Sequence, residues 1–140
     1  GAPVARGAYV LADAAHGEPD IVLIGTGSEV QVCLAAAKLL AADGIGARVV
    51  SMPCWELFEE QDAAYRDSVI PPDITARVTV EAASTLGWER YAGSRGTVIG
   101  LERFGASAPG ATVMKELGFT PERVAEAARA LVGGGERATA

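Results

Sequence analysis

The residues that could do chemistry gather first in a glycine-containing turn. The run Gly25-Thr26-Gly27-Ser28-Glu29-Val30 follows four apolar residues, 21–24, whose length and β-branched content favour a buried strand. Ser28 is a suitable helix N-cap, and Gln31 stands three residues later, which is the spacing of a capping box. A turn that aims helix N–H groups beyond a strand end is where α/β proteins hold anions. The candidates for such an anion site are Thr26, Gly27 and Ser28.

Details of the same turn disfavour two nucleotide-binding motifs. A dinucleotide-binding G-x-G-x-x-G motif needs its third glycine where Val30 stands. The next strand ends in Ser51-Met52-Pro53, which offers no acid for a ribose hydroxyl. A Walker P-loop needs Gly-Lys-Ser/Thr after four intervening residues, and Glu29 would repel a phosphate there.

Further polar residues follow the other expected strands, and a parallel sheet would bring them to one carboxyl edge: Ser51, Glu81, Arg103 and Ser107. Arg103 completes the candidate anion site. An ion pair between Glu81 and Arg103 is expected to order this edge without doing chemistry.

Nucleophilic catalysis and metal binding have little support. The single histidine, His16, falls in a polar turn and has no catalytic partner near it in the sequence, so a solvated loop residue is expected. Cys33 and Cys54 have no His or Cys at ligand spacing, and we expect buried free thiols. The alternative for Cys54, which follows a proline at a strand end, is a thiolate near a helix start.

Length and charge restrict the class of protein. The chain has 140 residues, which suits one domain, and 12 Lys plus Arg against 18 Asp plus Glu give a formal net charge of −6. Without a basic run, no electrostatic footprint for nucleic acid is present. The apolar runs are far shorter than the ~20 residues of a membrane span, so no membrane is expected as a partner and the cytoplasm is the default location.

Periodicity and turn residues place the secondary structure. We expect strands over 8–13, 21–24, 47–52, 75–81 and 97–101, and helices over 29–42, 55–68, 88–91 and 111–117, with a last one from Thr120. The connection over 14–20 is too short for a parallel crossover, so the first strand should be antiparallel. The apolar stripe expected to face the core from the helix over 29–42 consists of Val30, Cys33, Leu34, Ala37 and Ala41.

Strand and helix alternation predicts a three-layer α/β/α sandwich. Gly133-Gly134-Gly135 is expected to end both the last helix and the domain, which leaves a domain over 1–132 and a flexible tail over 133–140.

A set of motifs together resembles the C-terminal domain of transketolase. Their order and spacing match from about Gly7 to Val132, and the combination is specific although each motif alone is weak. The motifs are Gly25-Thr26-Gly27-Ser28-Glu29-Val30, Ala47 to Pro53, Gln61 to Pro71, Val80-Glu81-Ala82, Trp88 to Gly93, Phe104-Gly105-Ala106-Ser107-Ala108-Pro109 and Gly118-Phe119-Thr120.

The resemblance implies a mixed five-stranded sheet with one antiparallel strand. It also implies a parent enzyme of the pentose phosphate pathway that transfers a two-carbon ketol unit between sugar phosphates, using thiamine diphosphate and Mg²⁺ or Ca²⁺. In that family the two preceding domains hold the cofactor and metal at the interface of a homodimer. None of their motifs occurs here, so no catalytic, cofactor-binding or metal-binding residue is carried over onto this chain.

The sequence thus predicts a C-terminal transketolase domain that supports assembly or regulation, with no catalytic centre and inactive alone. The chain opens Gly1-Ala2-Pro3 without Met and is expected to be a piece of something longer. The alternatives are a free-standing nucleotide-binding or anion-binding module and a subunit of a split transketolase.

Overall fold

Five strands form one sheet, whose order in space differs from their order in the chain. The structure is a computed structural model that describes residues 5–27, 29–81, 89–93, 95–100 and 120–139. The strands are β1 (Tyr9–Ala12), β2 (Ile21–Gly25), β3 (Ala47–Ser51), β4 (Arg77–Glu81) and β5 (Thr97–Gly100), arranged β1-β3-β2-β4-β5. β1 is antiparallel to β3, and every other neighbouring pair is parallel. The mixed sheet with an antiparallel first strand is therefore confirmed.

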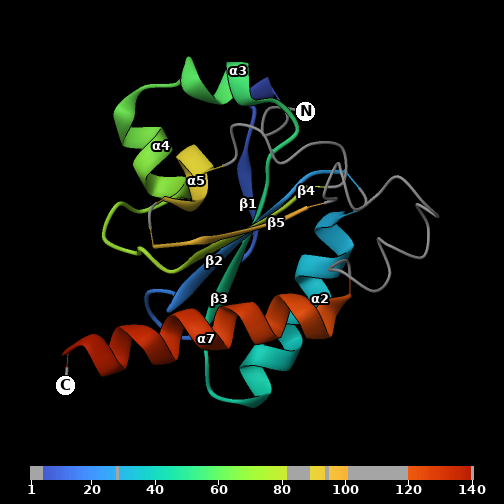
Figure 1. The fold of residues 1–140 in the computed structure, drawn as a ribbon. Coiled ribbons are helices and arrows are strands. Elements are labelled where there is room, and N and C mark those ends of the chain that lie inside the picture. Colours follow the sequence, from blue (N-terminus) through green and yellow to red (C-terminus); the bar gives the residue numbers. More distant parts are fainter. Residues whose placement is uncertain (1–4, 28, 82–88, 94, 101–119, 140) are drawn as a thin grey trace.

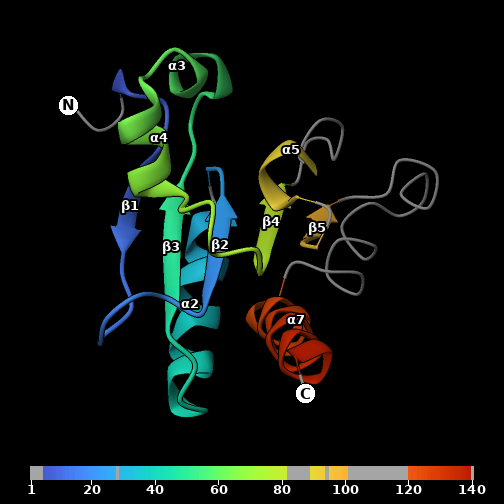
Figure 2. The ribbon, with the colours of Figure 1, turned by 90° about the vertical axis from the view of Figure 1, so that its left-hand side faces the viewer.

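Helices cover both faces of this sheet (Figures 1 and 2). One face carries α2 (Glu29–Ala42) and α7 (Pro121–Thr139), and the other carries α3 (Trp55–Glu59), α4 (Ala63–Val69) and α5 (Glu89–Ala92). The three-layer arrangement matches the prediction.

Alternate side chains of β2 contribute to the apolar clusters on the two faces of the sheet. All five of its residues are buried, because β3 and β4 flank it and helices cover both of its faces. Ile21 and Leu23 pack into the cluster under α2 and α7, whereas Val22 and Ile24 pack into the cluster under α3, α4 and α5. A one-residue shift of register would exchange the two sets, so the central strand fixes the pairing of the sheet.

Helix α2 has the expected bounds and ends in a Schellman motif. Gly44 has φ +78°, its N–H donates to the carbonyl of Ala41 at 3.0 Å, and the N–H of Ile45 donates to the carbonyl of Leu40 at 3.0 Å. A glycine fits this position because side chains disfavour a left-handed backbone.

The predicted apolar stripe of α2 was partly wrong. Its buried residues are Val30, Cys33, Ala36 and Leu40. Leu34 and Ala37 are only half-buried, and Ala41 is exposed. The helix packs against α7 as well as against the sheet, so the covered face follows Ala36 and Leu40 instead.

The expected helix over 55–68 is two short helices. The side chain of Asp62 accepts a hydrogen bond from the N–H of Tyr65 at 2.8 Å and caps α4. Before it, Gln61 N–H donates to the carbonyl of Phe58 at 3.1 Å and closes the turn after α3. The prediction missed this boundary because the apolar spacing continues across it.

Helix α7 begins as predicted but does not end as predicted. Thr120 Oγ1 accepts a hydrogen bond from the N–H of Arg123 at 3.1 Å and so caps the helix at its predicted start. The backbone then stays helical through Gly133-Gly134-Gly135 to Thr139, so the predicted helix end at Gly133 was wrong. The division into a domain over 1–132 and a flexible tail over 133–140 stays a prediction. The expected helix over 111–117 lies outside the described residues.

Candidate functional site

The carboxyl ends of β2 and β4 meet where the chain switches direction across the sheet. From β2 the chain passes through α2 to β3 on one side, and β4 later pairs with the other side of β2. Ligands of open α/β sheets bind at such switch points. Here Thr26 follows β2 and Glu81 ends β4, and the Thr26 hydroxyl donates a hydrogen bond of 2.8 Å to Glu81 Oε1.

The turn itself is closed by backbone hydrogen bonds. Glu29 N–H donates to the carbonyl of Thr26 at 3.0 Å, and Val30 N–H donates to the carbonyl of Gly27 at 3.2 Å. These two N–H groups at the start of α2 therefore have partners within the turn. Gly27 has φ +53°, the left-handed conformation that the tight corner requires.

Several of the predicted site residues fall outside the described part of the chain, namely Ser28, Arg103 and Ser107. Neither the Ser28 cap nor the Glu81–Arg103 ion pair is tested, and both stay predictions. The anion site at Thr26, Gly27, Ser28 and Arg103 also stays a prediction. Of the described members of the carboxyl edge, Ser51 is half-buried and pairs with Gly25 in the parallel ladder.

The two thiols have different surroundings. Cys33 is buried as predicted, and its burial, with the charge of Glu29 as a smaller cause, raises its pKa to about 12. Cys54 is only half-buried, so its expected full burial was wrong, and its Sγ lies 3.5 Å from Glu56 Oε1. Both are free cysteines, and His16 lies exposed between β1 and β2.

The described residues include no group of three or more His, Cys, Asp or Glu side chains that could hold a metal ion. The same part of the chain contains no helix long and apolar enough to cross a membrane.

A polar cluster that the sequence did not indicate lies on the helices that cover the second face of the sheet, α3, α4 and α5. Tyr91 donates a hydrogen bond of 2.6 Å to Glu59 Oε2, and Glu59 also lies 3.8 Å from Arg66 and 4.0 Å from Arg90. Burial, and then the Glu59 carboxylate, raise the pKa of Tyr91 well above its usual value. The cluster joins α3, α4 and α5, and no local spacing could have indicated it because its members come from three separate helices.

Arg77 is a half-buried charged group whose contacts the sequence did not reveal. Its guanidinium donates to the carbonyl oxygens of Ile74, Tyr91 and Pro71 at 2.8, 3.1 and 3.0 Å. Burial lowers its pKa. The side chain ties the segment before β4 to α5, which is a structural task.

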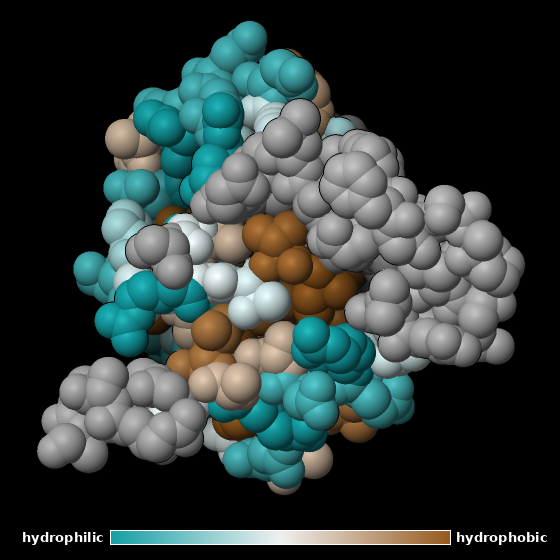
Figure 3. Space-filling model, in the orientation of Figure 1, coloured by the Kyte–Doolittle hydropathy of each residue, from teal (hydrophilic) through white to brown (hydrophobic). Residues whose placement is uncertain are grey.

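Apolar side chains reach the surface on one face of the molecule. Figure 3 shows them in the middle of the view, between α7 below and the helices above, with polar residues along part of their border. Apolar surfaces of this kind are suited to contacts with other protein.

Comparisons with known proteins agree with the fold and with the motifs. Residues 7–120 match the family model for the transketolase-like TK C-terminal domain. Over 130 residues the chain is 48% identical to a transketolase from Geobacillus stearothermophilus, covering 93% of this chain and 20% of that protein. A transketolase from Aquifex aeolicus is 55% identical over 122 residues, covering 87% of this chain and 18% of that protein.

Solved structures give the same result. The transketolase from Leishmania mexicana superposes with a TM-score of 0.82 at 39% identity, covering 94% of this chain and 19% of that chain. The chain thus spans about a fifth of the length of the relatives it matches. It belongs to the transketolase-like C-terminal domain family.

Proposed function

We propose that this chain is the C-terminal domain of a thiamine-diphosphate-dependent transketolase, which supports assembly or regulation and supplies no catalytic group. The parent enzyme would transfer a two-carbon ketol unit between sugar phosphates in the pentose phosphate pathway. The observation that carries the proposal is the family match over 7–120 together with relatives about five times as long. A Pichia stipitis transketolase that is 37% identical, with a TM-score of 0.82, is described in complex with xylulose 5-phosphate.

The relatives imply thiamine diphosphate and a divalent metal ion in the parent enzyme. The donor set described here does not fit that pair, because the Thr26 hydroxyl is engaged with Glu81 and no three potential metal ligands of the described residues lie together. Holding a diphosphate-bound Mg²⁺ or Ca²⁺ requires several oxygen donors around one point. We therefore assign the cofactor and the metal to the domains that precede this one.

The proposed partners are those preceding domains, within a homodimer of the parent enzyme. We place the parent in the cytoplasm, and the free thiols Cys33 and Cys54 are consistent with a reducing compartment. Regulation by an anion at Thr26, Gly27, Ser28 and Arg103 stays part of the proposal and rests on the position of the turn at the start of α2. Titration with inorganic phosphate, compared between the natural chain and Arg103→Gln, tests that point.

A domain exchange tests the main proposal. The corresponding C-terminal segment of the Geobacillus stearothermophilus transketolase is replaced by this chain, and the same enzyme cut and rejoined at that junction is the control. We expect the exchanged enzyme to be dimeric in sedimentation and to transfer ketol units, whereas the isolated 140-residue chain neither turns over nor binds thiamine diphosphate.

A Glu81→Gln variant of the exchanged enzyme separates support from catalysis. Glu81 is here a structural partner of Thr26, so kcat of the variant should stay within about twofold of the unsubstituted exchanged enzyme wherever the dimer forms. The loss of a catalytic acid or base would instead lower the rate by a factor of roughly 10²–10⁴. Turnover by the isolated chain would contradict the proposal. A decrease in kcat by a factor of roughly 10² or more in a Glu81→Gln variant that still forms the dimer would also contradict it. Binding of ATP or NAD by the isolated chain would favour the free-standing module instead.

A further inference from the structure

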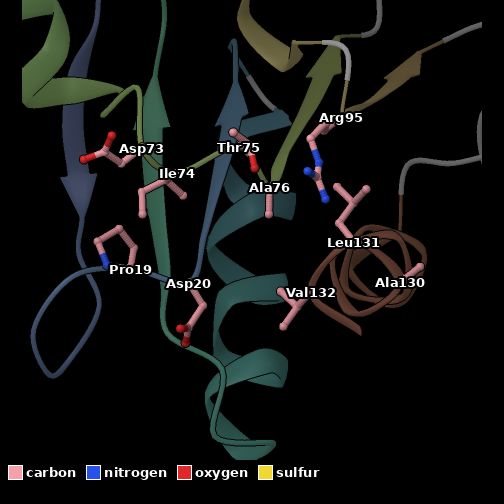
Figure 4. A pocket seen from close by; sticks show the side chains of 10 residues that line it. All are labelled: Pro19, Asp20, Asp73, Ile74, Thr75, Ala76, Arg95, Ala130, Leu131 and Val132. Carbon is pink, nitrogen blue, oxygen red and sulfur yellow. The ribbon is translucent and has the colours of Figure 1, made fainter. Parts of the chain in front are cut away.

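A cavity of about 620 Å³ lies at the edge of the sheet opposite to Thr26 and Glu81. Its walls come from the segments that precede β2, β4 and β5 and from the middle of α7. We call it the amino-edge cavity and define it by Asp20, Ile74, Ala76, Arg95, Leu131 and Val132 (Figure 4). The volume falls within the roughly 300–1,000 Å³ typical of small-ligand sites.

Arg95 supplies a cation at one end of the amino-edge cavity. Its guanidinium makes no hydrogen bond or ion pair with the described residues, unlike Arg48, Arg66, Arg77, Arg90, Arg123 and Arg129. In Figure 4 its nitrogen atoms point along the cavity toward Leu131. A guanidinium is a planar fork that binds a carboxylate through two parallel hydrogen bonds.

Asp20 supplies an anion at the other end, and the backbone holds it in place. Its Oδ2 accepts the N–H of Gly46 at 2.8 Å, while its own N–H donates to the carbonyl of Gly46 at 2.7 Å. The second carboxylate oxygen, Oδ1, has no hydrogen-bond partner among the described residues. It is therefore available to accept a hydrogen bond from an ammonium group.

Apolar side chains separate the two charged ends. Figure 4 shows Ala76, Leu131 and Val132 between Arg95 and Asp20. All three are half-buried, so a ligand that covered them would remove further apolar surface from water.

From this arrangement we propose that the amino-edge cavity binds a zwitterion of dipeptide size, with its carboxylate on Arg95, its ammonium on Asp20 and an apolar side chain against Leu131 and Val132. The charged residues that line the cavity favour a ligand that carries both a positive and a negative charge. Asp20 and Asp73 outnumber Arg95, so a simple anion gains from one cation and is repelled by two carboxylates.

The size of the ligand follows from the apolar residues that lie between the charged ends (Figure 4). A free amino acid carries its ammonium and its carboxylate on one carbon atom, so no part of its backbone separates the two charges as Ala76, Leu131 and Val132 separate Asp20 from Arg95. An extended chain advances roughly 3.5 Å per residue, so a second residue moves the carboxylate away from the ammonium. The space between them then accommodates one apolar side chain.

The test uses L-alanyl-L-leucine, its N-acetylated form and its C-terminal amide, each titrated into the 140-residue chain while amide resonances are followed by NMR. We expect saturable shifts at residues 74–76 and 131–132 with the free dipeptide. Blocking either end should weaken binding at least about tenfold, because each removes a charge-assisted contact.

Two variants assign the two contacts. Arg95→Gln should weaken the free dipeptide about tenfold and leave the affinity of the amide unchanged, since the amide lacks the carboxylate. Asp20→Asn keeps an oxygen for Gly46 N–H and should weaken the free dipeptide without affecting its N-acetylated form. Arg123→Gln removes the same charge on α7 at a residue that does not line the cavity, so it is the control and should bind like the natural chain.

The Arg95 side chain makes no polar contact with another described side chain, so Arg95→Gln should leave the fold intact. The Arg95→Gln variant therefore tests the proposal even if the Asp20→Asn variant does not fold. The absence of saturable shifts at about 10 mM dipeptide, a weak affinity by the usual scale, would overturn the proposal. Equal affinities of the dipeptide and its amide would also overturn it, as would equal binding by free leucine.

Discussion

Cys33 makes the stability of the domain sensitive to alkaline pH. Its thiol is buried beneath Gly25, where an added Cβ would come within 3.1 Å of Sγ, and its pKa is raised from 9.0 to about 12. Between these values the unfolded chain releases a proton that the folded chain keeps. The thiol therefore has no effect on stability below pH 9. As the pH rises above 9, the free energy of unfolding decreases.

At pH 10 this effect should lower the free energy of unfolding by about 1 kcal/mol relative to pH 8. Urea denaturation at the two pH values measures it. Cys33→Ala should reduce the difference by that amount, whereas Cys54→Ala should retain it. If the pH slope of Cys33→Ala equals that of the natural chain, the ionisation of Cys33 is not the cause.

The hydrogen bond from Thr26 to Glu81 holds the carboxyl edge together at the switch point. Because the bond is partly buried and its acceptor is a carboxylate, Thr26→Val should lower the free energy of unfolding by about 1–2 kcal/mol. Thr75→Val is the matched control, since Thr75 is exposed, and it should stay within about 0.5 kcal/mol.

Glu81 has further interactions besides the one with Thr26, so a double-mutant cycle with Glu81→Gln is needed to isolate the pair. The cycle should give a coupling free energy of about 1 kcal/mol. Strictly additive losses from the two single substitutions would show that this hydrogen bond does not stabilise the edge.

At the scale of whole elements, α7 gives the clearest difference between sequence and structure. A glycine inside a helix is less stable than an alanine by about 0.5–1 kcal/mol. Because Gly134 lies within the helix in the structure, Gly134→Ala should raise the free energy of unfolding by about 0.5 kcal/mol and increase the helical ellipticity. Gly44→Ala should have the opposite effect, since Gly44 has φ +78°. Unchanged stability and ellipticity of Gly134→Ala would favour the flexible tail over 133–140.

The sequence predicted the elements whose signals are local. The β2–α2–β3 unit was placed to within a residue because an apolar run, a glycine-containing turn, an amphipathic segment and Asp43-Gly44 follow one another directly. The helix over 55–68 was not divided, because the division depends on a cap by Asp62 inside a continuous apolar pattern. The inward face of α2 was misplaced because α7, almost eighty residues later in the chain, helps to cover it.

The candidate site could be predicted only in outline. The turn at Thr26 and the acid at Glu81 were expected at one edge, because the carboxyl ends of parallel strands meet there. Their direct hydrogen bond could not be predicted, since it depends on the pairing of β2 with β4. The amino-edge cavity was not indicated at all. Its charged ends, Asp20 and Arg95, stand in turns that have no common motif.

For the molecule as a whole, the sheet joins two apolar clusters that do not share residues. One lies under α2 and α7 and the other under α3, α4 and α5, and the alternate side chains of the same strands enter each. Because the backbone of β3 and its neighbours is common to both, neither cluster can be lost without disturbing the other. We therefore expect the domain to unfold in one cooperative transition, as small single domains usually do.

Val49 and Val50 test this expectation, because they are adjacent in β3, fully buried, and belong to different clusters. Val49→Ala and Val50→Ala should each lower the free energy of unfolding by about 2 kcal/mol through lost burial and an unfilled cavity. In each variant the far-ultraviolet ellipticity and the fluorescence of Trp55, which packs against the cluster of Val50, should change together at one denaturant concentration. A variant in which fluorescence changes well before ellipticity would show that the two faces unfold separately. Coincident transitions in both variants mean that packing on either face of the sheet stabilises both edges, and with them the turn at Thr26 and the amino-edge cavity.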